Sequence, residues 1–259
     1  MYTMKVGIIG AGAIANYILE KEKDHTYEVT SILVRDMEKY REISNKYHVT
    51  LYTDVQAFID SGVDIVVEAA TVEAVQAYVP QIIEQKDVVI ISIGAFVDDA
   101  FTQEVTSIAE KNNRNIFLPS GSIGGLDLVQ NVLATKNVEH VSLTTRKAAH
   151  TLVREPITEE KIAFQGSARE AIAVYPKNIN ISIALSLAGI GFDRTKVTMI
   201  ADPHATKNTH TIEVEGAFGK ASFTIENNPL PSNPSTSYLA AISVIGTLER
   251  QHGVIRIGQ

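Results

Sequence analysis

Short apolar runs alternate with amphipathic segments through the first half of the chain. Runs rich in Val and Ile predict strands at residues 5–9, 28–34, 49–52, 64–68, 88–92 and 115–118. Between them, apolar residues return at three- and four-residue spacing, which predicts helices over residues 37–47, 71–84 and 98–112. Nearly continuous apolar runs are typical of strands that are buried on both faces. The first half is therefore predicted to be an α/β domain with a doubly wound parallel sheet.

The pattern changes near Asn137. Longer stretches of alternating apolar and polar residues follow at 139–146, 196–201, 209–215 and 220–226, and predict an antiparallel sheet with one solvated face. Predicted helices lie at 168–175 and 179–188, a rigid surface loop at 227–234, and a last helix at 236–250. We expect a parallel-sheet domain over residues 1–136, a smaller α+β domain over 137–234, and a C-terminal segment, 235–259, that packs back on the first domain.

Composition narrows the class of protein. The chain has 259 residues, a net charge of −7 and no Cys, which disfavours nucleic acid and anionic membranes as partners and removes every thiolate chemistry. Its apolar runs are far shorter than the roughly 20 residues of a membrane helix, and the N-terminus lacks the pattern of a secretory leader. We expect a cytoplasmic protein that acts on small molecules.

A glycine-rich turn joins the first predicted strand to a segment compatible with a helix. Its sequence is GAGAIA, residues 10–15. Gly10 permits the tight turn, Gly12 lets backbone amides approach a diphosphate, and the small Ala15 lets the helix pack closely on the strand. This order predicts a Rossmann domain that binds a dinucleotide through Gly10, Gly12, Ala13 and Ile14.

The end of the second strand leaves the choice of dinucleotide open. Asp36 is close to the position where a carboxylate accepts hydrogen bonds from the adenine ribose of NAD. Arg35 precedes it and offers a guanidinium for the 2′-phosphate of NADP. Both residues are candidate cofactor contacts, and the alternative is that they form a solvated turn pair.

Ligands of such folds lie outside the carboxyl ends of the strands. Small residues follow three successive strands here, and they include Ala70, Gly94 and the segment 119–125. Ala70 and Gly94 are therefore candidate cofactor contacts, and Ser120 is a candidate ligand of a substrate carboxylate. The alternative for residues 119–125 is a Ser-capped start of the helix predicted at 126–136.

Several long motifs extend these expectations over nearly the whole chain. They are GIIGAGAIA (7–15), VVEAA (66–70), SIGAF (92–96), FLPSGSIGGLD (117–127), YPKNINIS (175–182) and ADPHATKNTHTIEV (201–214). On these motifs the chain resembles the L-aspartate dehydrogenase family. The resemblance implies a Rossmann lobe with a small α+β lobe, and the oxidative deamination of L-aspartate with NAD or NADP to iminoaspartate or, after hydrolysis, oxaloacetate and ammonia.

The resemblance also assigns roles to single residues. It places the catalytic histidine at His210 and nicotinamide-side contacts at Ser122 and Asn180. The family usually has Ala at the position of Ser122, and some relatives have the acid at the end of the second strand earlier than Asp36, so the cofactor preference cannot be carried over. An alternative role for Asn180 is the N-cap of the following helix.

Independent chemical reasoning favours a histidine as acid and base, because its ordinary pKa of about 6.5 allows proton exchange near neutrality. Among the seven His residues, His204 and His210 follow a rigid Asp-Pro break in a polar loop, so His204 is the reserve candidate. Lys147 is the preferred partner of a substrate carboxylate, and Asn208 is a further candidate substrate contact. No residue set at metal-ligand spacing stands out, so we expect no metal.

Two alternatives to aspartate oxidation stay open. One is another small-substrate dehydrogenase or an imine reductase on the same scaffold, since pocket side chains decide substrate choice. The other is a non-catalytic NAD(P)-sensing regulator. A homodimer is expected on the general frequency of two-fold assemblies alone.

Overall fold

The chain forms two units in the computed structural model, which describes residues 3–176 and 179–255. The first unit contains the chain up to Pro119 and again from Ala241, and the second contains the chain from Ser120 to Ala240. Lys177 and Asn178 of the YPKNINIS motif, and the last four residues of the C-terminal segment, lie outside the described residues. No helix in the described ranges is long and apolar enough to span a membrane.

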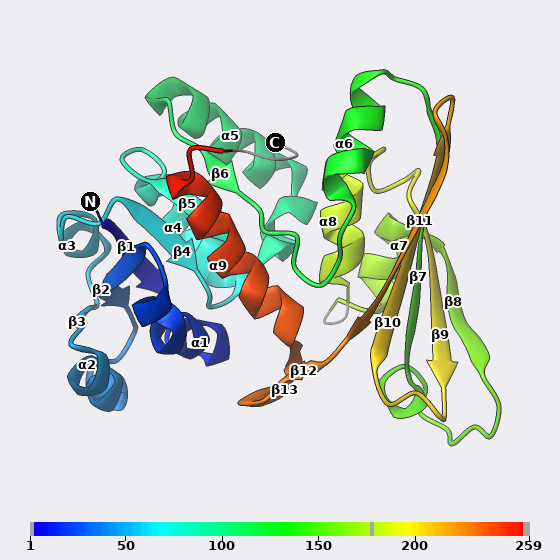
Figure 1. Ribbon diagram of the computed structural model, residues 1–259, viewed down its shortest axis with the longest axis horizontal. Coiled ribbons are helices and arrows are strands. Elements are labelled where there is room, and N and C mark those ends of the chain that lie inside the picture. Colours follow the sequence, from blue (N-terminus) through cyan, green and yellow to red (C-terminus); the bar gives the residue numbers. More distant parts are fainter. Residues whose placement is uncertain (1–2, 177–178, 256–259) are drawn as a thin grey trace. The chain divides into compact units, whose positions relative to one another are not determined.

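The first unit contains a six-stranded parallel sheet in the order β3-β2-β1-β4-β5-β6 (Figure 1). Its strands are β1 (Met4–Ile9), β2 (Tyr27–Leu33), β3 (Thr50–Tyr52), β4 (Ile65–Glu68), β5 (Asp87–Ile90) and β6 (Ile116–Phe117). Its helices are α1 (Ala13–Lys21), α2 (Arg41–Tyr47), α3 (Val55–Ile59), α4 (Val72–Ile82) and α5 (Asp99–Asn112), with short 3₁₀ turns η1 (Glu22–Asp24), η2 (Glu38–Tyr40) and η3 (Ile93–Val97). The predicted doubly wound fold is confirmed.

The last helix, α9 (Tyr238–His252), belongs to the core of this first unit along most of its length. Val244, Ile245 and Leu248 are buried in the apolar cluster formed by β1, β2 and α1. Glu249 adds a polar contact, because its carboxylate accepts a hydrogen bond from the Thr26 amide at 3.0 Å. A segment at the far end of the chain thus completes the N-terminal core.

The second unit contains a five-stranded sheet in the order β11-β10-β7-β9-β8. Its strands are β7 (Val138–Ala148), β8 (Lys161–Ser167), β9 (Lys196–Asp202), β10 (Asn208–Gly216) and β11 (Gly219–Asn227), and its helices are α6 (Leu126–Ala134), α7 (Ala168–Val174) and α8 (Asn180–Ala188), with a 3₁₀ turn η4 (Ala149–Thr151). The expected antiparallel sheet is a mixed one, since β7 and β9 pair in parallel. The long connection through η4, β8, α7 and α8 returns the chain to the same end of the sheet, which a parallel pair requires.

Two further expectations need correction. The boundary expected at residue 136 falls after Pro119, because α6 buries Val129 and Val132 in the core of the second unit. The segment 227–234, expected to be a surface loop, contains the short strand β12 (Pro229–Leu230). This strand pairs antiparallel with β13 (Asn233–Ser237), which begins within the same segment. Leu230 is 1% exposed, so this segment carries its own buried anchor.

Burial of α9 predicts a stability effect at Leu248. This side chain is fully buried, and Leu248→Ala should lower the free energy of unfolding by about 2–5 kcal/mol, since the cavity removes packing within the core of the first unit. Urea denaturation followed by circular dichroism measures the change. Ile242→Ala on the same helix is the control, because Ile242 is 40% exposed; equal losses in the two variants would contradict the docking of α9.

Candidate functional site

The glycine turn of the first unit has a backbone that only glycine accommodates at one position. Gly10 has a φ of +95°, and a Cβ there would come within 2.8 Å of the Ala70 Cβ. The Gly10 amide donates a hydrogen bond to the Leu33 carbonyl at 2.9 Å, which holds the turn against the end of β2. The turn therefore needs glycine for its conformation and for its approach to the residues after β4.

The space in front of helix α1 fits a diphosphate. Gly12 is the N-cap, and no side chain caps the helix. A Cβ on Gly12 would meet nothing closer than the Ala69 carbonyl at 3.9 Å, so the absent side chain leaves this space open. Ala13 and Ile14 form the first turn, whose amides lack acceptors within the helix and carry the positive end of its dipole. These residues match the requirements of a bound dinucleotide diphosphate.

The other predicted cofactor contacts of this unit lie at the ends of neighbouring strands. Ala70 follows β4 and lies against Gly10, as the glycine geometry shows. Gly94 lies in η3 after β5, where a Cβ would come within 2.8 Å of a methyl group of Val72. Gly94 therefore has a packing requirement of its own, and its contact with a cofactor stays a prediction.

A buried carboxylate that the sequence reasoning overlooked connects these strand ends. Glu68, the last residue of β4, has no exposed surface. Its Oε1 accepts hydrogen bonds from the Ala70 amide at 2.7 Å and the Ser92 hydroxyl at 2.9 Å, and its Oε2 accepts one from the Ser92 amide at 2.9 Å. Burial raises the pKa of Glu68, and these hydrogen bonds oppose the rise. The sequence signal for this role was a glutamate at the end of an otherwise apolar strand.

Arg35 and Asp36 are exposed after β2. The Asp36 carboxylate accepts a hydrogen bond from the Lys39 amide at 3.2 Å and so closes the turn that leads into η2. The structure thus gives Asp36 a local role in this turn, and its contact with a ribose stays a prediction. The Arg35 side chain stays in solvent beside this turn.

In the second unit, the register of the sheet places the candidate histidine in a defined setting. His210 on β10 lies opposite Thr145 on β7, and its Nδ1 is 3.1 Å from the Thr145 Oγ1. Only 3% of His210 is exposed. Burial, with a smaller effect of the positive charge of Lys147, lowers the pKa of His210 to about 4. His210 is therefore neutral near pH 7.

Lys147 shares a sheet face with this histidine. It lies two residues after Thr145 on β7, and successive alternate residues of a strand point to one side. Burial lowers the pKa of Lys147. Its neighbour Arg146 forms ion pairs with Asp202, at 3.1 Å, and with Glu160, so its charge is already compensated. The role of Lys147 as the partner of a substrate carboxylate stays a prediction.

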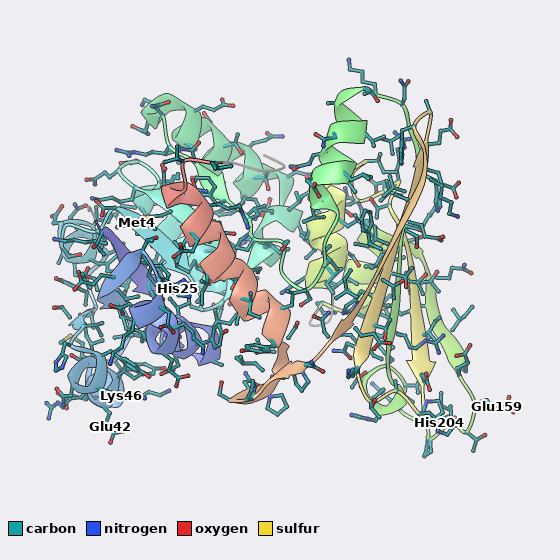
Figure 2. The ribbon with its side chains drawn as sticks, viewed as in Figure 1. Met4, His25, Glu42, Lys46, Glu159 and His204 are labelled. Carbon is teal, nitrogen blue, oxygen red and sulfur yellow. The ribbon has the colours of Figure 1, made fainter. Side chains whose placement is uncertain are left out.

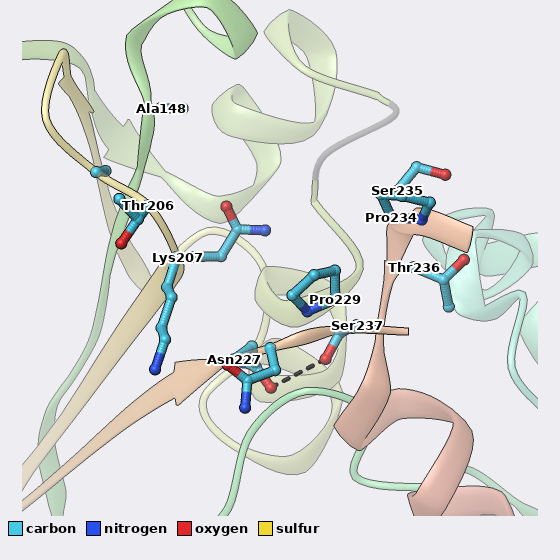
Figure 3. A pocket seen from close by; sticks show the side chains of 12 residues that line it. Ala148, Thr206, Lys207, Asn227, Pro229, Pro234, Ser235, Thr236 and Ser237 are labelled. Carbon is cyan, nitrogen blue, oxygen red and sulfur yellow. Dashed lines mark hydrogen bonds between the residues drawn. The ribbon is translucent and has the colours of Figure 1, made fainter. Parts of the chain in front are cut away.

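Asn208 extends the same face and lines a pocket. It precedes His210 by two residues on β10 and pairs in register with Asn227 on β11. The pocket has a volume of about 150 Å³, and Lys207, Asn208 and Asn227 are among its lining residues (Figure 3). This volume is below the roughly 300–1,000 Å³ of typical ligand pockets, so the contact of Asn208 with a substrate stays a prediction.

Asn227 is a second residue that the sequence reasoning missed. It is 5% exposed, and its Nδ2 donates to the Ser122 carbonyl at 2.9 Å. Its Oδ1 accepts from the Ser237 hydroxyl at 2.9 Å, as Figure 3 shows. Both ends of its amide are occupied, so Asn227 fixes the position of the loop before α6. Because its partners are distant in sequence, nothing local to Asn227 indicated this role.

The serine-rich loop does not cap α6. The N-cap is Gly125, with a φ of +76° and no side-chain hydrogen bond, so the alternative of a Ser-capped helix start is wrong. Ser120 and Ser122 are half-buried. Helix α8 starts at Asn180 with Ile179 as its N-cap, and Asn180 is exposed, so the capping alternative for Asn180 is also wrong. The ligand contacts expected of these residues stay predictions.

The reserve histidine lies in a different environment. His204 is exposed in the connection between β9 and β10 (Figure 2), and its backbone amide donates to the Asp202 carboxylate at 2.8 Å. The structure thus gathers His210, Lys147 and Asn208 on one sheet face and leaves His204 in solvent.

Solved structures of similar shape include two informative examples. The aspartate dehydrogenase of Thermotoga maritima aligns with a TM-score of 0.80 and 30% sequence identity, covering 99% of this chain and 100% of that protein. A homoserine dehydrogenase from Thiobacillus denitrificans has a TM-score of 0.63 at 14% identity, covering 96% of this chain and 73% of the other. The second similarity concerns the fold alone.

Family models and curated relatives give the same assignment. The model described as homoserine dehydrogenase, NAD binding domain, matches residues 6–119, and the one described as aspartate dehydrogenase, C-terminal, matches residues 127–251. Together with the glycine turn, these matches define an NAD(P)-dependent oxidoreductase. The L-aspartate dehydrogenases of Methanosarcina barkeri and Methanococcoides burtonii are 36% and 37% identical, each over 98% of this chain and 99% of the relative. The chain belongs to the L-aspartate dehydrogenase family.

The low pKa of His210 predicts a pH-dependent stability. Between the folded pKa of about 4 and the unfolded value of about 6.5, the unfolded chain binds more protons at this group. Above about pH 6.5 His210 is neutral in both states and does not change the stability with pH. As the pH decreases to 4 and below, protonation of His210 in the unfolded chain lowers the free energy of unfolding by roughly 3 kcal/mol.

Urea denaturation between about pH 7.5 and about pH 4.5 measures this effect, with His210→Gln as the variant. The variant should lose less stability than the wild type over this interval, because glutamine does not titrate. His204→Gln, at an exposed position, should follow the wild type. Parallel curves for the wild type and His210→Gln would show that burial does not depress this pKa.

Proposed function

We propose that this protein oxidises L-aspartate at Cα with NAD(P), giving iminoaspartate, which water converts to oxaloacetate and ammonia. The observation that carries the proposal is the buried, neutral His210 sharing a sheet face with Lys147, in a chain of this family. Relatives with the name L-aspartate dehydrogenase match the chain nearly end to end, which supports the same substrate here. The substrate is an acid with two carboxylates, so a site for it needs positive charge.

The proposed chemistry assigns the proton transfers to His210. Bound NAD(P) supplies the acceptor for the hydride that leaves the substrate Cα. His210 takes one proton from the substrate ammonium group, so the C–N bond gains its second pair of electrons as the C–H bond breaks. His210 then releases this proton to solvent, and in the following hydrolysis the neutral imidazole removes a proton from the attacking water. If Nδ1 donates to the Thr145 hydroxyl, Nε2 keeps the lone pair that these steps need.

Lys147 has two effects in this proposal. Its ammonium group binds a substrate carboxylate, and burial of the Lys147 side chain strengthens that attraction. A bound carboxylate also reduces the repulsion that Lys147 exerts on a protonated His210. The substrate thereby raises the pKa of His210 toward the working pH, so the base becomes stronger when aspartate is present.

The remaining predicted contacts take supporting positions in the proposal. Gly10, Gly12, Ala13 and Ile14 hold the diphosphate at the start of α1. The strand-end and loop residues proposed for the rest of the cofactor are Ala70, Gly94, Ser122 and Asn180. Ser120 and Asn208 are proposed to join Lys147 in contacting the substrate.

A substrate panel tests the reaction. Purified protein is mixed with NAD or NADP and L-aspartate, D-aspartate, L-glutamate, L-alanine or L-malate, and reduced nicotinamide is followed by its absorbance. L-Aspartate should give the highest kcat/KM, and ammonia should form in equal amount with the reduced cofactor. Faster oxidation of L-malate than of L-aspartate would assign the site to another small-substrate dehydrogenase.

Replacement of the proposed base provides a second test. His210→Gln should lower kcat with L-aspartate by about 10²-fold or more while leaving the dissociation constant of the cofactor unchanged, since the loss concerns proton transfer. His204→Gln is the matched control and should retain wild-type kcat, because His204 is exposed. A wild-type rate in His210→Gln, or a large loss in His204→Gln, would transfer the role of base away from His210.

A further inference from the structure

The residue that directly follows β2 cannot contact a ribose. The Gly10 amide donates to the Leu33 carbonyl at 2.9 Å, so the glycine turn and the end of β2 are in direct contact. Val34 comes next, and its amide donates to the Tyr52 carbonyl at 2.8 Å, which extends the strand by one residue. Its side chain is apolar, 6% exposed and part of the core. The position nearest the turn therefore offers no carboxylate to the adenine ribose of a dinucleotide.

The acids that come later in this segment each accept a hydrogen bond from within the segment. The Asp36 carboxylate accepts a hydrogen bond from the Lys39 amide at 3.2 Å. The Glu38 carboxylate accepts one from the Arg41 guanidinium at 2.6 Å. Within the described ranges, no carboxylate forms an ion pair with Arg35, and this side chain is exposed beside the turn.

We propose that Arg35 binds the 2′-phosphate of NADP and that this protein uses NADP in preference to NAD. The inference rests on the proposed function, because it assumes a dinucleotide in the first unit. A planar guanidinium forms two parallel hydrogen bonds with a phosphate, whereas the 2′-hydroxyl of NAD is recognised by a carboxylate. The chain presents the exposed guanidinium of Arg35 just after β2, and the residue before it, Val34, is apolar and buried.

A binding experiment isolates this contact from catalysis. Calorimetric titration of the whole protein with 2′,5′-ADP and with 5′-AMP compares ligands that differ in the 2′-phosphate and contain no nicotinamide. The wild type should bind 2′,5′-ADP about tenfold or more tightly than 5′-AMP at low ionic strength, and added salt should reduce the ratio. Arg35→Gln should bring the ratio close to one while its affinity for 5′-AMP stays near that of the wild type.

Arg41→Gln is the matched control, since Arg41 lies in the same segment but is paired with Glu38. This variant should keep the wild-type ratio. Retained affinity for 5′-AMP shows that each variant is folded.

Two results would overturn the proposal. One is equal binding of both ligands by the wild type, and the other is an unchanged ratio in Arg35→Gln. A weaker affinity for 5′-AMP in Asp36→Asn would assign the ribose to Asp36 and also count against it. Because the assay contains no amino acid, a failure of aspartate oxidation leaves its outcome unaffected.

Discussion

The close approach of the Gly10 backbone to Ala70 is the constraint on which the site of the first unit depends. The distance between a virtual Gly10 Cβ and the Ala70 Cβ is 2.8 Å, so no larger residue fits at this turn. The contact joins three neighbouring strands, because the Gly10 amide bonds to the end of β2 and the Ala69 amide bonds to the end of β1 at 3.0 Å. Glu68 fixes the same segment from within, through the Ala70 amide. These few bonds position the glycine turn before α1 against the ends of β2 and β4.

In the second unit, burial determines the chemistry. His210 and Lys147 share one face of the sheet, and burial lowers the pKa of each below its ordinary value because water no longer stabilises the charged form. The positive charge of Lys147 also disfavours protonation of His210. In the proposed reaction, a substrate carboxylate bound by Lys147 reduces this repulsion.

Local patterns were sufficient for some features because their causes are local. The Val-rich runs and the glycine turn predicted the parallel sheet and the dinucleotide-type domain, since strand burial and turn conformation depend on adjacent residues. The parallel pairing of β7 with β9, which makes the second sheet a mixed one, was not predictable in this way, because it depends on the long connection between the two strands. Strand β8 escaped prediction for a related reason: it is an edge strand without regular alternation of burial.

The sequence by itself determined the class of fold, the family and the identity of the candidate base, because these follow from motifs whose residues are contiguous. The tertiary structure alone decided the environment of that base. Thr145 and His210 are neighbours through strand pairing, Asn227 joins Ser122 to Ser237 across the second unit, and α9 returns to complete the N-terminal core. Each of these contacts joins residues far apart in the chain. Burial, charge and hydrogen-bond partners at such positions are properties of the packed molecule, so no local pattern records them.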